Sequence, residues 1–205
     1  MTDTTEKALE AALAQSAPSD HDLEGATSGL IARAEREGLV EVAFATVESP
    51  YGELFLAATE RGVVKLGLPN LGTDGVLEQL ADEISPRVLE SPERLDPARR
   101  ELDAYFSGRL ERFETPVDWR LSRGFFDKVL HVVAKIPYGS TLSYGEVAEK
   151  AGNPRAFRAA GSACGANPVP LIVPCHRVVQ AGGNPGNYGG GPEMKRALLE
   201  LEGGL

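Results

Sequence analysis

One of the two cysteines in the chain, Cys175, stands directly before a histidine and an arginine. The apolar run 169–173, which Pro170 interrupts, leads into Pro174 and then into this polar trio. Because proline disfavours helix before it and removes a backbone donor, we expect Cys175 at a rigid bend rather than inside a helix. A thiol reacts as its thiolate, which a neighbouring imidazole or cation favours. Cys175 is therefore a candidate nucleophile, and His176 and Arg177 are the neighbours that could favour its thiolate.

The dipeptide by itself leaves other interpretations open, the first being a buried structural cysteine. Adjacent side chains of an extended segment point to opposite faces, so His176 can serve Cys175 only if the backbone turns between them. A cysteine-histidine hydrolase is a further alternative, because the same pair can act on esters or peptides. Repeated turnover would distinguish a hydrolase from an enzyme whose thiol is consumed.

The residues around the pair form a longer pattern. Asn167-Pro168 precede it, Pro174-Cys175-His176-Arg177-Val178 contain it, and Gly186-Asn187-Tyr188-Gly189-Gly190 follow it. This pattern resembles the active-site signature of the O6-alkylguanine-DNA alkyltransferases, the methylated-DNA-protein-cysteine methyltransferases. The resemblance is close over 125–202 and looser over 42–119, and it does not extend to residues 1–40. It implies DNA repair in which an alkyl group moves from O6-alkylguanine, or O4-alkylthymine, to Cys175 once per molecule and without a cofactor.

The resemblance also implies how the site works. An alkyl group on guanine O6 is hidden in the base stack, so the nucleotide must be turned out of the duplex. His176 would take the thiol proton through a water, and Glu202 would fix the histidine tautomer; Glu200 is the only near competitor for that role. Tyr144 would offer its hydroxyl to the purine, and the backbone N–H of Gly189 would meet O6 as negative charge develops there. The catalytic residues implied are Cys175, His176, Glu202 and Tyr144.

DNA-binding residues follow from the resemblance in the same way. In this family the recognition helix enters the minor groove of duplex DNA, where Arg158 would fill the gap left by the nucleotide and Tyr144 would crowd its phosphate. Arg155 and Lys195 are the phosphate candidates, because we expect Arg177 to pair inside the protein. The expected DNA-binding set is Arg158, Tyr144, Arg155, Ala159, Gly161 and Lys195. The expected hinge and base-pocket set is Asn167, Val178, Tyr188, Gly189 and Gly190.

The elements that must position these residues can be read from periodicity and turn residues. The strand patterns, which predict a three-stranded antiparallel sheet, are 42–47, 53–58 and 63–68. The helical patterns before the cysteine segment are 76–84, 97–106 and 122–134. Ser143 and Glu146 form a capping box for a helix over 144–150, and Pro154 suits the first position of a second helix that ends near 166. Two short helices joined by a tight turn predict a helix-turn-helix.

The expected fold class is therefore α+β, with a small N-terminal α/β domain followed by a mainly helical C-terminal domain that contains the helix-turn-helix. The expected boundaries are 1–40 for an acidic extension, 41–119 for the N-terminal domain and 120–205 for the C-terminal domain. In the extension, helical patterns at 8–17 and 26–39 flank a linker over 16–22. The extension is either a partly ordered tail or a segment that binds a partner or competes with DNA.

A formal net charge of −9 is unusual for a protein that binds DNA, because phosphate contacts need lysine and arginine. The uneven distribution of charge along the chain accounts for much of this discrepancy. Residues 1–40 hold 3 basic and 8 acidic side chains, whereas residues 120–205 hold 10 basic and 6 acidic ones. The positive charge thus lies in the same part of the chain as Cys175, which predicts local steering and a modest salt dependence.

Composition argues against several other classes. No apolar run approaches the roughly 18 residues of a membrane span, and the acidic N-terminus does not resemble a secretory signal. Two cysteines give no disulfide framework, and with three scattered histidines they give no zinc-binding spacing, so we expect no metal. Some members of the family carry a structural zinc in the N-terminal domain, but Cys164 and Cys175 both lie in the C-terminal part. We expect a cytoplasmic monomer.

Two alternatives remain within the resemblance. Non-catalytic alkyltransferase-like proteins sense alkyl lesions without repairing them, but they have tryptophan in the place of Cys175. An alkylation-responsive regulator usually has an additional DNA-binding domain, and the acidic extension is too short and too poor in basic residues to be one.

Overall fold

The computed structural model describes residues 20–69 and 74–204. The chain divides into two compact units, Met1–Leu39 and Val40–Leu205, and each is described by itself. The described part of the first unit contains one helix, α2 (Asp20–Arg36). Arginines in its last turn interact favourably with the negative end of the helix dipole. The predicted helix over 8–17 lies outside the described residues. The predicted linker is wrong in its last residues, because α2 already begins at Asp20.

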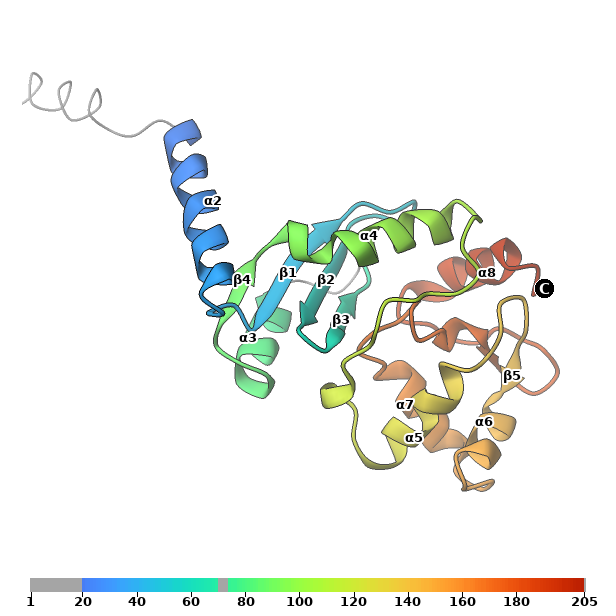
Figure 1. Ribbon diagram of the computed structural model, residues 1–205. Helices are drawn as coiled ribbons and strands as arrows, with labels where there is room; N and C mark the ends of the chain where they lie inside the picture. The colour runs from blue at the N-terminus through green and yellow to red at the C-terminus, as the bar shows by residue number, and fades with distance from the viewer. Residues whose placement is uncertain (1–19, 70–73, 205) are drawn as a thin grey trace, which may run out of the picture. The chain divides into compact units, whose positions relative to one another are not determined.

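A four-stranded sheet forms the first part of the second unit, and its strands can be followed in Figure 1. Its strands are β1 (Val42–Val47), β2 (Leu54–Thr59), β3 (Gly62–Gly67) and β4 (Val88–Glu90). The strand order is β3-β2-β1-β4; β2 is antiparallel to both neighbours, whereas β4 is parallel to β1. The three predicted strands are confirmed. The sequence analysis missed β4, because three residues are too few to show an alternating pattern.

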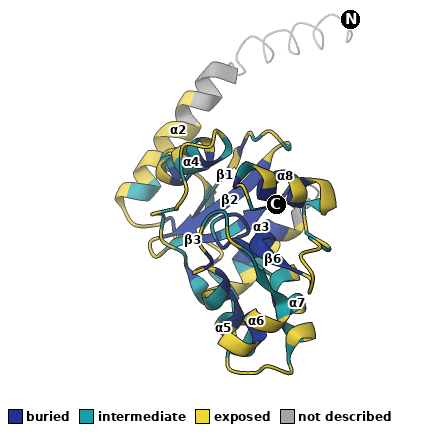
Figure 2. Ribbon diagram, turned by 90° about the vertical axis from the view of Figure 1, so that its right-hand side faces the viewer, coloured by how far each residue is buried: buried dark blue, intermediate teal, exposed yellow. Residues whose placement is uncertain are grey.

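Each face of the sheet packs against other parts of the chain, so β2 is buried on both of its faces (Figure 2). Successive side chains of a strand point to opposite faces. Leu56 accordingly packs in the larger core with residues of α4 (Pro92–Phe106), whereas Phe55 packs in a second core with residues of α3 (Asp74–Glu83). Both helices are confirmed, although α4 begins five residues before the predicted pattern, with a proline in its first turn.

The segment after α4, which leads to the helical part and contains Pro116, is hydrogen-bonded to the first residues of β3. Gly62 has a φ of +130°, and a Cβ there would collide with the carbonyl group of Pro116. Val63 donates its N–H to the Pro116 oxygen at 2.8 Å and accepts the N–H of Asp118 at 2.8 Å. Only glycine allows this approach, which sets where the chain enters its helical part.

The second part of this unit is mainly helical. Its elements are η1 (Trp119–Leu121), α5 (Gly124–Val133), β5 (Leu142–Ser143), α6 (Tyr144–Lys150), α7 (Phe157–Gly165), η2 (Cys175–Arg177), β6 (Val178–Val179) and α8 (Gly191–Leu201). The short strands β5 and β6 pair in parallel, which brings the start of α6 beside the end of the cysteine segment. The expected fold class is confirmed. The larger core includes residues from both predicted domains, and their boundary near 119 stays a prediction.

The helix-turn-helix consists of α6 and α7, which pack against each other and against α5. The capping box is confirmed, because Ser143 accepts the N–H of Glu146 at 3.2 Å and the Glu146 carboxylate accepts the N–H of Ser143 at 2.7 Å. Pro154 lies in the turn rather than at the first helical position, since α7 begins at Phe157. Within the described ranges, no helix is long and apolar enough to cross a membrane.

Candidate active site

Cys175 begins the single 3₁₀ turn of η2, directly after Pro174, so the predicted bend is confirmed. Its side chain lies in the larger core, and the residue is 4% exposed. Asn167 spans the approach to it: its amide donates to the Val173 carbonyl at 2.8 Å and its side-chain oxygen accepts the N–H of Val169 at 3.1 Å. These bonds tie the end of α7 to the cysteine segment, as expected of the hinge residue, whose role in motion stays a prediction.

The environment of Cys175 holds it as a thiol. Burial raises the pKa of the Cys175 thiol, and a hydrogen bond from Asn167 and the nearby charge of Lys195 offset only part of this rise. A thiol with a raised pKa is a weak nucleophile near neutral pH. The cysteine therefore needs a base at the moment of reaction.

His176 has the properties of that base. Its imidazole is fully buried, with Nε2 at 2.9 Å from Oε1 of Glu202 and at 3.3 Å from the hydroxyl of Tyr105. An ionised carboxylate only accepts, so the ring proton lies on Nε2 and Nδ1 is unprotonated. Burial lowers the pKa of His176 even though Glu202 acts in the opposite direction, and the ring is neutral at pH 7. Nδ1 is buried and has no hydrogen-bond partner among the described residues.

Glu202, just after α8, is the centre of a buried network. Besides the Nε2–H of His176, its carboxylate accepts Nε and Nη2 of Arg177 at 2.8 and 2.9 Å and the hydroxyl of Tyr105 at 2.7 Å. Burial alone would raise the pKa of Glu202, but the hydrogen bonds from His176 and Arg177 outweigh it and lower the pKa to about 2. Arg177 also donates to the Ile136 carbonyl at 2.6 Å. The prediction that Arg177 pairs inside the protein is confirmed.

Lys195 is placed differently from the prediction. It is fully buried, and its ammonium donates to the Val178 carbonyl at 2.6 Å and lies 5.9 Å from the centre of the Tyr144 ring. Burial lowers its pKa, an effect that the two cysteines oppose. The prediction that Lys195 contacts DNA phosphate is therefore wrong. A lysine in the first turns of an amphipathic helix looks like a surface residue in the sequence, and only the fold shows that this one faces the cysteine segment.

Tyr144 begins α6 and lies between that lysine and the second helix. A Cβ at Gly161 of α7 would be 3.8 Å from its ring, so the two helices meet closely here. Burial raises the pKa of Tyr144 to about 12, which keeps its hydroxyl protonated and able to donate. Gly161 therefore contributes to helix packing beside the site, and its contact with DNA stays a prediction.

The outer side of α7 and the turn before it, which contains Arg155, offer the exposed residues that DNA contact requires. Arg155, Phe157 and Arg158 are exposed, whereas Ala159 is half-buried. The guanidinium of Arg158 lies 5.5 Å from the centre of the Phe157 ring, within the range of a cation–π contact. Phe157 is 49% exposed, which is unusual for a large apolar side chain.

The base-pocket candidates Tyr188, Gly189 and Gly190 lie in the loop before α8, and Val178 lies directly after η2. Tyr188 packs its ring edge to face against His176 with ring centres 6.3 Å apart, and its hydroxyl is buried. Gly189 is exposed, and Gly190 is half-buried. A Cβ at Gly190 would overlap the sulfur of Met194, so a larger residue there would require the Met194 side chain to move. The loop and the Val178 carbonyl therefore lie close to the cysteine segment.

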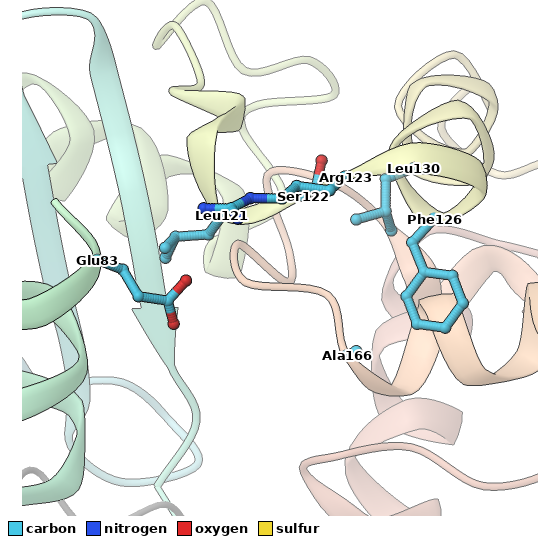
Figure 3. Close-up of a pocket in the computed structure, with 7 residues that line it drawn as sticks. All are labelled: Glu83, Leu121, Ser122, Arg123, Phe126, Leu130 and Ala166. Atoms are coloured by element: carbon cyan, nitrogen blue, oxygen red, sulfur yellow. The ribbon is translucent and has the colours of Figure 1, made fainter.

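Other parts of the described chain show no comparable arrangement. One pocket of about 270 Å³ lies between the end of α3 and the start of α5 (Figure 3). Its lining residues are Glu83, Leu121, Ser122, Arg123, Phe126, Leu130 and Ala166. The hydroxyl of Ser122 donates to Asp127 at 2.7 Å, and the residues that line the pocket include no histidine, lysine or cysteine. Among the described residues, no group of histidine, cysteine and acidic side chains could hold a metal ion.

Comparison with known families agrees with the geometry around Cys175. A model of the 6-O-methylguanine DNA methyltransferase DNA-binding domain matches residues 124–204, and a model of the ribonuclease-like domain of the same enzyme matches residues 42–119. The chain belongs to the 6-O-methylguanine DNA methyltransferase family. The acidic extension lies outside both matches.

Individual members of this family are similar over most of their length. The chain is 43% identical over 159 residues to the methylated-DNA-protein-cysteine methyltransferase of Mycobacterium tuberculosis, which covers 78% of this chain and 91% of the relative. It is 38% identical over 160 residues to the enzyme of that name from Methanosarcina acetivorans, which covers 78% and 97%. Among solved structures, the O6-methylguanine methyltransferase of M. tuberculosis is 39% identical with a TM-score of 0.68 over 79% of this chain and 93% of that one. The OGT of the same organism in complex with DNA is 39% identical with a TM-score of 0.67 over 78% and 92%.

Sequence reasoning missed one residue of the site, Tyr105. It lies on α4, in the part of this methyltransferase chain for which we expected only a structural role, and it is fully buried. Its hydroxyl reaches Glu202, which is 97 residues later in the chain. The helical pattern over 97–106 shows that one face is buried, but no local signal shows which partner that face meets.

Proposed function

We propose that this protein repairs DNA by transferring an alkyl group from O6-alkylguanine to the sulfur of Cys175, once per molecule. The observation that carries the proposal is the state of His176, a neutral imidazole next to Cys175 whose Nε2–H is held by Glu202 and whose Nδ1 is free. Membership of the methyltransferase family supports the same reaction. The lesion-sensor alternative is not favoured, since the nucleophile and its base are both present.

The proposed reaction is an in-line displacement. Nδ1 of His176 takes the thiol proton through a water, and a sulfur lone pair of Cys175 forms the bond to the alkyl carbon. The bond from that carbon to O6 breaks, and its electron pair stays on the purine, which gains a proton and becomes guanine. Donors that meet this charge as it develops lower the barrier. We assign that role to the Tyr144 hydroxyl and the Gly189 backbone N–H. The product thioether does not return the alkyl group, so the protein is consumed.

DNA recognition is proposed to use the helix-turn-helix, with α7 in the minor groove. Arg158 on α7 and Arg155 in the turn before it are both exposed, which supports the proposal that Arg158 fills the space of the turned-out nucleotide and Arg155 contacts phosphate. The same pocket would accept O4-alkylthymine. A monomer in a reducing cytoplasm fits a site that depends on a free thiol.

The test is the mass of the intact protein after mixing with an excess of duplex oligonucleotide that contains one O6-methylguanine. We expect a gain of one methylene mass per protein, mapped to the peptide with Cys175, and no further gain with time. Cys175→Ala should show no gain while retaining binding to the duplex, and Cys164→Ala should still gain the mass. Continued product formation beyond one event per protein would instead indicate a hydrolase. Binding without any gain would indicate a sensor.

A further inference from the structure

Two buried polar atoms beside the nucleophile have no hydrogen-bond partner among the described residues. They are Nδ1 of His176 and the hydroxyl of Tyr188. Buried polar atoms are nearly always paired, so each exception requires an explanation. The two rings pack edge to face with centres 6.3 Å apart, which makes a single explanation for both atoms possible.

A single buried water could be the partner that both atoms lack. A water in a buried polar site usually has two to four partners. We propose that Tyr188 is a positioning residue for thiol deprotonation, because its hydroxyl and His176 Nδ1 together hold the water that contacts the Cys175 sulfur. This inference rests on the proposed function and gives Tyr188 a role in proton removal in addition to packing in the base pocket.

The hydrogen bonds of the water follow from the protonation states. The thiol of Cys175 donates to the water oxygen, and the water donates one of its own hydrogens to Nδ1 of His176, which can only accept. The Tyr188 hydroxyl donates to the same oxygen and keeps its proton, because burial raises its pKa well above the ordinary value. In the reaction one proton moves from sulfur to water as another moves from water to Nδ1. Tyr188 fixes the oxygen in place and exchanges no proton.

The experiment is single-turnover transfer from a duplex containing O6-methylguanine, measured over a range of DNA concentrations. Tyr188→Phe keeps the ring and removes only the hydroxyl. We expect the rate constant at saturating DNA to fall about five- to tenfold, the effect of losing one hydrogen bond. The half-saturating DNA concentration should change less than twofold. Tyr51→Phe is the matched control, since Tyr51 is a half-buried tyrosine that packs edge to face on Phe106, and it should change neither constant.

A double-mutant comparison separates positioning from packing. His176→Gln breaks the relay, so adding Tyr188→Phe to that variant should reduce the rate less than twofold further. An unchanged rate in Tyr188→Phe alone would overturn the inference, and so would a full additional loss in the His176→Gln background. If His176→Gln does not fold, the single variant decides through its rate at saturation and an unchanged melting temperature. Absence of transfer by the wild-type protein would refute the proposed function itself, whereas these outcomes with wild-type transfer intact refute only the role of Tyr188.

Discussion

Replacing Glu202 with glutamine should destabilise the protein strongly at neutral pH and much less in acid. The carboxylate has its pKa lowered from 4.5 to about 2 in the folded protein. At about 1.4 kcal/mol for each pH unit, this difference corresponds to about 3 kcal/mol of folding free energy. The variant also leaves the buried Arg177 guanidinium without its counter-charge, and breaking a buried ion pair in this way costs about 3–5 kcal/mol. The two arguments agree on a loss of about 3 kcal/mol at pH 7.

The pH dependence has a defined sign. A carboxyl group whose folded pKa is lowered adds stability above its unfolded pKa, and that stability is lost as the pH falls toward the folded value. For Glu202 the stabilisation is complete above about pH 5.5, and about 2 kcal/mol of it is lost between pH 7 and pH 3. The difference between the wild type and Glu202→Gln should therefore shrink by this amount over the same range.

Urea unfolding at pH 7, 5, 4 and 3 measures this difference. At pH 7 the melting temperature should also fall by roughly 6–12 °C, the shift that 3 kcal/mol produces in a domain of this size. Glu200→Gln is the matched control, because Glu200 is exposed and lies two residues before Glu202; this variant should stay within about 0.5 kcal/mol of wild type. A Glu202→Gln difference that does not vary with pH would refute the assignment of the lowered pKa to this carboxylate.

Two further predictions concern residues that the sequence analysis missed or misplaced. Tyr105→Phe removes one of the donors to Glu202 and should lower the unfolding free energy by about 1–2 kcal/mol, measured by urea unfolding, with no change in DNA affinity. Lys195→Met should leave the slope of log K against log salt for duplex binding unchanged, because a buried lysine releases no DNA counterions. Arg155→Ala should reduce that slope by about 0.9, because its exposed guanidinium is the proposed phosphate contact. An equal reduction in both variants would show that Lys195 reaches the DNA after all.

Local signals in the sequence were sufficient for the helix-turn-helix and for the shape of the cysteine segment. The capping box at Ser143 fixes where α6 starts, because its hydrogen bonds join residues three apart in the chain. The prolines around Cys175 exclude a regular helix there, and the structure has a single 3₁₀ turn. In both cases the determining interactions lie within a few residues of one another.

Interactions between distant segments were beyond the same reasoning. Lys195 has the charge of a surface residue, yet the fold places its ammonium against the Val178 carbonyl. Tyr105 has the pattern of an ordinary core residue, yet its hydroxyl completes the network of Glu202. Strand β4 exists because β1 offers it a partner edge, not because its own residues demand a strand. Each of these depends on which surfaces meet, and periodicity within one element does not contain that information.

The contact between Tyr105 and Glu202, which are 97 residues apart in the chain, has a consequence for folding during synthesis on the ribosome. The chain emerges from its N-terminus at about 5–20 residues per second, so Cys175 appears before Glu202 and long after α4. Until the segment after α8 docks onto Tyr105, nothing holds the Nε2–H of His176 in place. Contacts so distant in the chain are slow to form. A newly made chain therefore carries its thiol before the carboxylate that orients His176 has been synthesised, and the proton relay is complete only after Glu202 has reached Tyr105 and His176.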